Sequence, residues 1–432
     1  GKDVHGNLTI TDTATESNTG TDTLIDIESI VFADKTLTVT EGLGVPSELF
    51  VTPNNNAYQS AIDALAVGGF VSVWRGGDAE GYGILAQVFD STGAASGNVI
   101  NVNTTISGNQ EEPAVAGLSD GRFVVTWESN NDGSGRDIFG RIYDPQGVAE
   151  GDEFQISTEN SGQQRIAKVS ALENGRFVVV WHQENDADGS GQGVFGQIFD
   201  EAGAKEGGQL LINSITYQSQ RTPDVSLLSD GGFVVVWQDY AVENNNWGIQ
   251  GKRFDASGAA ISDQFSINTN VPPSQERPEV VGLENGGFVA VWKSYSQDVA
   301  NKWTLYGRVF DASGADVGEE FRIDSATPGG DDLSGYSVAA TTEGGFVVVW
   351  DQYITSGFNI HQDILGQRFD ASGNKISEEF SLVENQYGSQ VTPDVTVTQD
   401  GDIVAFYRDE WFGGRAELVI NRIDQSLVSG NT

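Results

Sequence analysis

The sequence GGFVVVW at 231–237 decides the fold, because the chain contains seven versions of it. The other copies end at Trp74, Trp127, Trp181, Trp292, Trp350 and Tyr407, and successive copies are 53 to 58 residues apart. A fixed period of this length is typical of a repeat architecture in which each copy forms one structural unit. Because the aromatic residue recurs in every copy, we expect it in the core between units.

Each repeat contains four segments that are typical of strands. Around the apolar run lie segments such as PDVSLL at 223–228, DIFGRIYD at 137–144 and EFQIST at 153–158. Short β-branched and aromatic runs bounded by Gly, Asp and Asn indicate strands, and no segment has a helical period. The sequence therefore predicts an all-β fold, a seven-bladed β-propeller of four-stranded antiparallel blades. A solenoid is the weaker alternative, because it needs capping repeats.

The two ends of the repeat region are predicted to join. The seventh copy stops after its third strand, ELVINRID at 417–424, whereas residues 48–59 resemble the fourth-strand segment at 379–390. We expect residues 48–53 to complete the last blade and remove an exposed strand edge. The propeller would span 46–432, and a small β appendage would occupy 1–45. The blades are expected near 54–110, 111–164, 165–220, 221–275, 276–335, 336–390 and 391–424.

Composition excludes several classes of function. The chain has 62 Asp and Glu against 23 Lys and Arg, a net charge of −39, and no Cys. Such an acidic surface repels nucleic acids and anionic membranes. Without Cys there is no disulfide, thiol nucleophile or Cys-based zinc site. No apolar stretch reaches the roughly 18 residues of a membrane span.

The two faces of the ring are predicted to differ. Tight turns such as LSDGG at 228–232 and DASGA at 255–259 join strands one to two and three to four. Asp-Gly and Asn-Gly favour hairpin turns, and an Asp at the start favours an Asx turn over a metal site. The opposite face carries the longer, unequal loops, for example 238–248 and 293–304. Function tends to lie on varied loops of a rigid scaffold, so we expect any ligand there.

Aromatic side chains that break the repeat are the candidates for ligand binding on this long-loop face. They are, with one histidine, Tyr240, Trp247, Tyr295, Trp303, Tyr353, His361 and Trp411. Aromatic faces stack on sugar rings and anchor partners. The alternative is that they pack together as small local cores. A Gln that recurs before each apolar run, as at Gln110 and Gln220, is expected to bond neighbouring backbone.

Two oxygen-rich loops are candidates for calcium binding. They offer Asp132, Asp137, Asp186 and Asp188 beside glycines that allow a sharp bend. Calcium prefers six to eight such oxygen ligands. The alternative is a pair of solvated turns.

Catalysis has no clear signal. The three histidines are His5, His182 and His361, and they lie in different parts of the repeat plan. There is no Gly-x-Ser-x-Gly elbow and no His pair with zinc spacing. A triad assembled from distant segments stays open, but a non-catalytic protein is the stronger expectation.

Residues 1–45 carry a further motif, NLTITD at 7–12 followed by GTDTLIDIESIVFADKTLTV at 20–39. This segment resembles the end of secreted hemolysin-type (RTX) calcium-binding modules. Residues 49–424 are similar to repeats in very large secreted bacterial surface proteins and adhesins. The resemblance implies an extracellular or cell-surface location, type I export and a longer parent polypeptide.

Three functions are therefore compared. The leading hypothesis is a non-catalytic adhesion module that recognises a glycan or a surface protein, with calcium as a tentative cofactor. The alternative is a structural propeller that serves as a spacer or assembly subunit. The third is an extracellular polysaccharide hydrolase.

Overall fold

The computed structural model describes most of the chain from residue 58 onward. The described residues are 8–11, 21–24, 29–31, 36–38, 47–51, 58–78, 80–130, 135–157, 162–184, 188–240, 246–270, 274–325, 333, 335–356, 359–383, 389–411 and 415–423. For the strands before residue 52, and for 354–356, 359–360, 411 and 415–417, the backbone alone is described.

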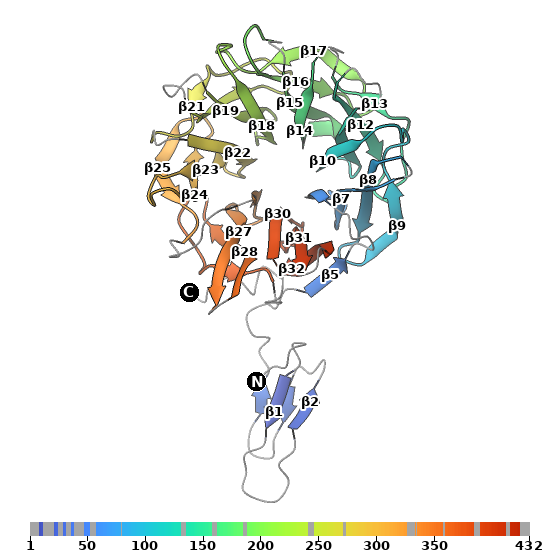
Figure 1. The fold of residues 1–432 in the computed structure, drawn as a ribbon, viewed down its shortest axis with the longest axis vertical. Coiled ribbons are helices and arrows are strands. Elements are labelled where there is room, and N and C mark those ends of the chain that lie inside the picture. The colour runs from blue at the N-terminus through green and yellow to red at the C-terminus, as the bar shows by residue number, and fades with distance from the viewer. Residues whose placement is uncertain are drawn as a thin grey trace, which may run out of the picture. The chain divides into compact units, whose positions relative to one another are not determined.

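The chain divides into two compact units, residues 1–45 and 46–432. In the first unit, β1 (Leu8–Thr11) pairs with β2 (Thr21–Leu24), and β3 (Ser29–Val31) pairs with β4 (Thr36–Thr38). In the second, seven four-stranded antiparallel sheets surround a central channel (Figure 1). The predicted seven-bladed propeller is therefore confirmed.

The first four blades follow the chain in strand order, from the channel outward. Blade one holds β6 (Tyr58–Ala64), β7 (Phe70–Gly77), β8 (Tyr82–Phe89) and β9 (Ala95–Asn101). Blade two holds β10 (Gln110–Gly117), β11 (Phe123–Ser129), β12 (Asp137–Tyr143) and β13 (Phe154–Gln155). Blade three holds β14 (Gln164–Ala171), β15 (Phe177–Gln183), β16 (Gly193–Phe199) and β17 (Lys205–Leu211), with a 3-10 turn at Glu173–Gly175. Blade four holds β18 (Gln220–Leu227), β19 (Phe233–Asp239), β20 (Gly248–Phe254) and β21 (Phe265–Ser266).

The last three blades include the closure of the ring. Blade five holds β22 (Ser274–Gly282), β23 (Phe288–Tyr295), β24 (Trp303–Phe310) and β25 (Asp316–Arg322). Blade six holds β26 (Tyr336–Ala340), β27 (Phe346–Ser356), β28 (Asn359–Phe369) and β29 (Phe380–Ser381). Blade seven holds β30 (Ser389–Val397), β31 (Ile403–Trp411), β32 (Arg415–Ile423) and β5 (Ser47–Val51). Val51 lies opposite Val419 and Ser47 opposite Arg422, so an N-terminal strand closes the ring as predicted.

The core lies between successive blades. Trp181 and Trp237 have no exposed surface, because each packs against the blade before it. The cluster around Trp127, for example, includes Val71 and Val73 of blade one. Strand two is apolar on both faces because it is covered on both sides. The aromatic column is thus core, as expected.

The innermost strands contain a β-bulge that the repeat pattern did not predict. In six blades the register shifts near the start of the first strand, and one residue there has positive φ. These bulge residues are Gln59, Glu112, Ile166, Thr222, Arg277 and Thr392. In four blades a side chain of the preceding blade accepts a hydrogen bond from the N–H of the bulge residue. The acceptors are Gln59 Oε1 at 3.2 Å, Glu128 Oε1 at 2.7 Å, Gln238 Oε1 at 2.9 Å and Asp351 Oδ2 at 3.0 Å. A bulge re-aims side chains at a sheet edge, here at one end of the channel.

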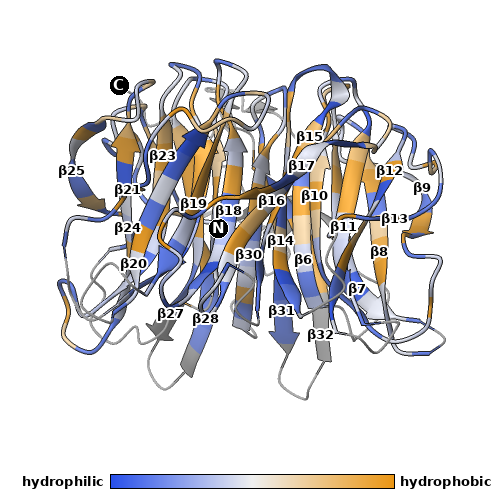
Figure 2. Ribbon diagram, turned by 90° about the horizontal axis from the view of Figure 1, so that it is seen from above, coloured by the Kyte–Doolittle hydropathy of each residue, from blue (hydrophilic) through white to orange (hydrophobic). Residues whose placement is uncertain are grey.

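The two faces differ as predicted. Figure 2 shows the ring from the side, and the hairpins β27–β28 and β31–β32 extend furthest on the lower, long-loop face. On the other face Asp255 Oδ1 accepts hydrogen bonds from the N–H groups of Ser257 and Ala259 at 2.8 and 3.0 Å. The same Asx contacts occur at Asp144, Asp200, Asp311 and Asp370.

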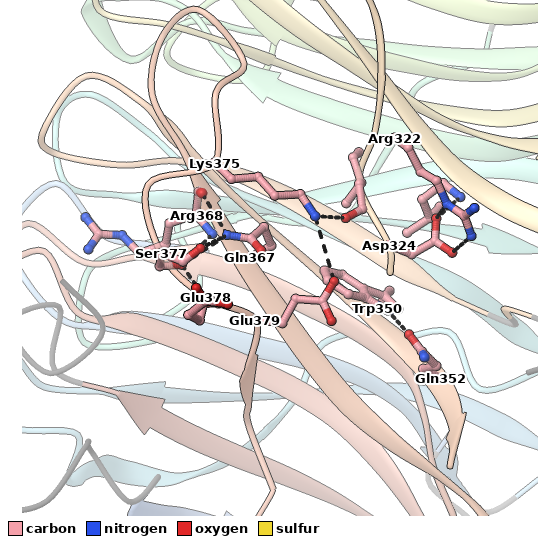
Figure 3. Close-up of polar contacts among 12 residues, drawn as sticks. Arg322, Asp324, Trp350, Gln352, Gln367, Arg368, Lys375, Ser377, Glu378 and Glu379 are labelled. Carbon is pink, nitrogen blue, oxygen red and sulfur yellow. Dashed lines mark hydrogen bonds and ion pairs between the residues drawn. The ribbon is translucent and has the colours of Figure 1, made fainter. Parts of the chain in front are cut away.

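Polar contacts also join neighbouring blades at the outer rim. Lys375 Nζ, after β28, donates to the Ile323 carbonyl of blade five at 2.8 Å (Figure 3). Within blade six, Gln367 Nε2 donates to the Ser377 carbonyl at 2.7 Å. The recurring Gln has the expected structural role, since Gln220 Nε2 donates to the Tyr217 carbonyl at 3.0 Å. Within the described residues, no helix has the length and apolar character needed to cross a membrane.

Candidate functional site

The residue that follows the repeated aromatic side chain varies among the blades, and only Arg occurs there twice. These seven residues are Arg75, Glu128, His182, Gln238, Lys293, Asp351 and Arg408. In six blades a first-strand residue lies opposite, namely Tyr58, Glu111, Arg165, Arg221, Glu276 or Val391. Strand two ends, and strand one begins, on the long-loop face. Together with the bulge residues, these positions surround the end of the channel on that face, and we call them the channel mouth.

The sequence-based analysis concentrated on the loops and missed the channel mouth. One signal was present in the sequence: a fixed place beside a recurrent Trp is occupied by Arg, Glu, His, Gln, Lys and Asp in turn. A position of the scaffold that varies among polar residues indicates a surface that can bind a ligand.

Four of the aromatic residues predicted to bind a ligand contact one another as two pairs. Tyr240 and Trp247 lie at the two sides of the β19–β20 connection, with ring centroids 5.0 Å apart. Tyr295 and Trp303 pair across β23 and β24 at 5.2 Å. All four side chains are half-buried. Each pair therefore packs within its own hairpin, as the local-core alternative expects, and still presents surface to solvent.

These aromatic side chains also cover cations of the channel mouth. The Arg221 guanidinium lies 4.1 Å from the centroid of Trp247, and Lys293 Nζ lies 5.2 Å from that of Trp303. In blades seven and one, Arg408 and Arg75 stack similarly on Tyr58. Such contacts stabilise a cation by about 0.5–2 kcal/mol, depending on solvation. They connect the predicted loop aromatics to the mouth.

A cavity opens at the mouth in blade five. Its volume is about 360 Å³, and Glu276, Arg277, Lys293 and Trp303 line it. The cavity thus combines an aromatic face with two cations and one carboxylate. Of these four residues, the sequence-based analysis had singled out only Trp303.

The remaining predicted ligand residues lie elsewhere. Tyr353 and His361 belong to the long β27–β28 hairpin of blade six, and neither lines the cavity. His361 Nε2 is 3.3 Å from Asp363 Oδ1, and burial raises the pKa of that carboxyl despite the imidazole. The side chain of Trp411 lies outside the described residues.

The two described calcium candidates, Asp137 and Asp188, lie apart, and each is hydrogen-bonded within the protein. Asp137 is buried and receives a hydrogen bond from Ser157 Oγ at 3.4 Å, whereas Asp188 receives one from Asn213 Nδ2 at 2.8 Å. The two carboxylates belong to different blades, and each is used within its own blade. Asp132 and Asp186 lie outside the described residues. In the part of the chain that is described, no three His, Asp or Glu side chains are grouped to hold a metal ion.

Titratable groups at the mouth, among them His182 and Glu112, have displaced pKa values. Burial, helped by the charges of Arg165 and Arg221, lowers the pKa of His182 to about 3, so its imidazole is neutral. Burial raises the pKa of Glu112, although Arg165 and Lys168 oppose the shift. The mouth therefore contains a carboxyl group that holds its proton more strongly than an exposed Glu.

Comparison with known proteins yields the fold. No family model and no curated protein matches this sequence. A protein of unknown function from Dyadobacter fermentans has a similar solved structure, with a TM-score of 0.51 and 10% identity over 88% of this chain and 98% of that one. An α-L-arabinanase from Penicillium chrysogenum, complexed with arabinobiose, has a TM-score of 0.49 and 14% identity over 89% and 98%. The NanB sialidase from Streptococcus pneumoniae has a TM-score of 0.47 and 10% sequence identity, over 89% of this chain and 71% of that one. At these identities the likeness is one of architecture.

Proposed function

We propose that this chain binds a glycan at the channel mouth. The observation that carries the proposal is the blade-five cavity, where Trp303 lies beside Arg277, Lys293 and Glu276. An aromatic face that packs on a sugar ring, next to a few polar groups that fix its orientation, is the usual composition of a small-ligand pocket. The resemblance to secreted adhesins supports a location outside the cell, within a longer surface protein.

Replacement of Trp303 tests this site. A glycan array, run with calcium and with chelator, identifies a ligand, and tryptophan fluorescence then measures its affinity. Trp303→Ala should weaken binding by about tenfold or more, the loss expected for one aromatic anchor of about 2 kcal/mol. Tyr217→Ala is the matched control, because Tyr217 is an aromatic residue that is 66% exposed between blades three and four.

The same experiment separates the alternatives. Binding that Trp303→Ala leaves unchanged would place the site elsewhere. No glycan bound under either calcium condition would favour the structural-spacer alternative. Binding that is lost with chelator would support calcium at the loops that contain Asp132 and Asp186.

Polysaccharide hydrolysis is the second candidate function, and Glu112 favours it. A carboxyl whose pKa is raised by burial suits the general acid of a glycosidase, and Glu112 lies at the mouth. The propeller fold also occurs in an arabinanase and a sialidase. Release of reducing ends from any bound polysaccharide, abolished by Glu112→Gln with binding retained, would make the protein an enzyme. Binding without release supports the adhesion function.

A further inference from the structure

The channel mouth concentrates positive charge in a strongly acidic protein. Acidic residues outnumber basic ones 62 to 23 in the whole chain, whereas the mouth positions hold five carboxylates, Glu111, Glu112, Glu128, Glu276 and Asp351, against six basic residues. They are Arg75, Arg165, Arg221, Arg277, Lys293 and Arg408. Clustered cations attract an anion, and the rest of the surface would repel it. The ligand that this arrangement fits is therefore an anion bound at one place.

Carboxylates neutralise the mouth on one side only. In blades one and seven, Arg75 Nη1 is 2.9 Å from Glu111 and Arg408 Nη1 is 2.5 Å from Glu410. Arg165 Nε lies within 3.9 Å of Glu128. These ion pairs balance the charges of Arg75, Arg408 and Arg165 with carboxylates of the protein itself.

In blades four and five, Arg221 and Arg277 lack this compensation. They share this part of the mouth with Lys293 and with the carboxylate of Glu276. Among the described residues, neither Arg221 nor Arg277 has an ion-pair partner, and the buried Nε of Arg221 makes no hydrogen bond. Burial lowers the pKa of Arg221, and Arg277 contributes in the same direction. This part of the mouth, which adjoins the Trp303 cavity, thus carries excess positive charge.

Hydrogen bonds from neighbouring blades fix the backbone of Arg277. It is the bulge residue of blade five, with φ of 53°, and the equivalent residues of the other bulged blades are Gln, Glu, Ile, Thr and Thr. Its N–H donates to Gln238 Oε1 at 2.9 Å, and its carbonyl accepts from the Tyr336 hydroxyl. The side chain is exposed and lines the cavity. A fixed backbone lowers the entropy lost on binding, and a guanidinium matches a carboxylate with two parallel hydrogen bonds.

We infer that the glycan carries a carboxylate, which the Arg277 guanidinium binds while a sugar ring packs on Trp303. The inference rests on the proposed glycan-binding function and names its chemical class. Uronic acids and sialic acids both supply a sugar ring with a carboxylate. Arg221 and Lys293 would add positive charge to the same pocket.

Calorimetric titration of the full chain with matched ligand pairs tests the inference. The pairs are trigalacturonate with its methyl ester, and 3′-sialyllactose with its methyl ester, so that each pair differs only in the charge of the carboxylate and the arms separate uronic from sialic acids. One acidic ligand should bind at least about tenfold more tightly than its neutral partner, as a charged hydrogen-bonded pair provides. Arg277→Gln should abolish this preference, so that the acidic ligand binds no more tightly than its neutral partner.

A control and a competitor complete the test. Arg122→Gln lies on the tight-turn face, where Arg122 pairs with Asp120, and should keep the preference. Equal affinity for acidic and neutral partners, or equal binding of dextran sulfate, would overturn the carboxylate inference and leave the proposed function standing. Failure of every sugar to bind would overturn both.

Discussion

At the residue scale, carboxylates of the innermost strands accept hydrogen bonds from the backbone of the next blade, a role that the sequence pattern did not predict. The innermost strand of each blade has a free edge, and its N–H groups need acceptors. Asp224 Oδ2 accepts from Val280 N–H at 2.8 Å, Asp63 Oδ2 from Gly117 N–H at 2.9 Å and Asp394 Oδ2 from Ile62 N–H at 2.9 Å. Each contact joins one blade to the next. We therefore assign these carboxylates to the scaffold and not to the ligand site.

Their placement predicts an unusual dependence of stability on pH. Burial raises the pKa of Glu279 from 4.5 to about 8, with Lys168 opposing and Asp224 and Asp394 adding to the shift. Burial likewise raises the pKa of Asp63 to about 6. Between pH 4.5 and 8 the folded chain then binds more protons than the unfolded chain, so the free energy of unfolding falls as pH rises.

Urea denaturation at pH 5, 6.5 and 8 measures this slope. Glu279→Gln should flatten the slope by up to about 1.4 kcal/mol per pH unit, the limit for one titrating group. Asp90→Asn is the control. Asp90 lies on the tight-turn face and its pKa is lowered, chiefly by the Thr92 hydroxyl, so it titrates below this window. An unchanged slope in Glu279→Gln would show that Glu279 does not keep its proton in the folded chain.

At the scale of elements, β5 closes the ring by pairing with β32 in blade seven. Removal of residues 1–53 deletes β5 and exposes the edge of β32, which should lower the melting temperature and promote association through that edge. Removal of residues 1–44 takes away most of the separate N-terminal unit and should leave the melting temperature within about 1 °C, the shift that about 1 kcal/mol causes in a chain of this size. Scanning fluorimetry and size-exclusion chromatography compare the two. Equal stability of both truncations would refute closure by β5.

The strands that could be predicted are the second strands of the blades, because their burial on both faces requires a continuous run of apolar residues. The apolar runs of β7, β11, β15, β19, β23 and β27 were visible because both faces are covered. The bulge was not, since a shift in register changes which residues are opposite without changing the residues themselves. Arg277 therefore seemed to be an ordinary first-strand residue, whereas Trp303 stood out because it interrupts a repeat. The sequence therefore predicted the aromatic residue of the candidate site and did not predict its arginine.

At the scale of the whole molecule, repetition and departure from it have different roles. The tight-turn face repeats one Asx turn, the core repeats one Trp, and the channel repeats interblade hydrogen bonds. The channel mouth repeats its backbone and varies its side chains: blade two contributes three carboxylates, whereas blades four and five together contribute three cations and one carboxylate. With a net charge of −39, the chain offers an anionic sugar one attractive region. We conclude that the ligand site is where the scaffold allows variation.

The most direct test of this conclusion is a crystal structure of the full chain with the tightest-binding acidic oligosaccharide. We predict a sugar ring against Trp303 and its carboxylate on the Arg277 guanidinium, at the mouth in blade five. A sugar bound on the tight-turn face, at the outer rim or at the β27–β28 hairpin, with the Trp303 cavity empty, would contradict the account.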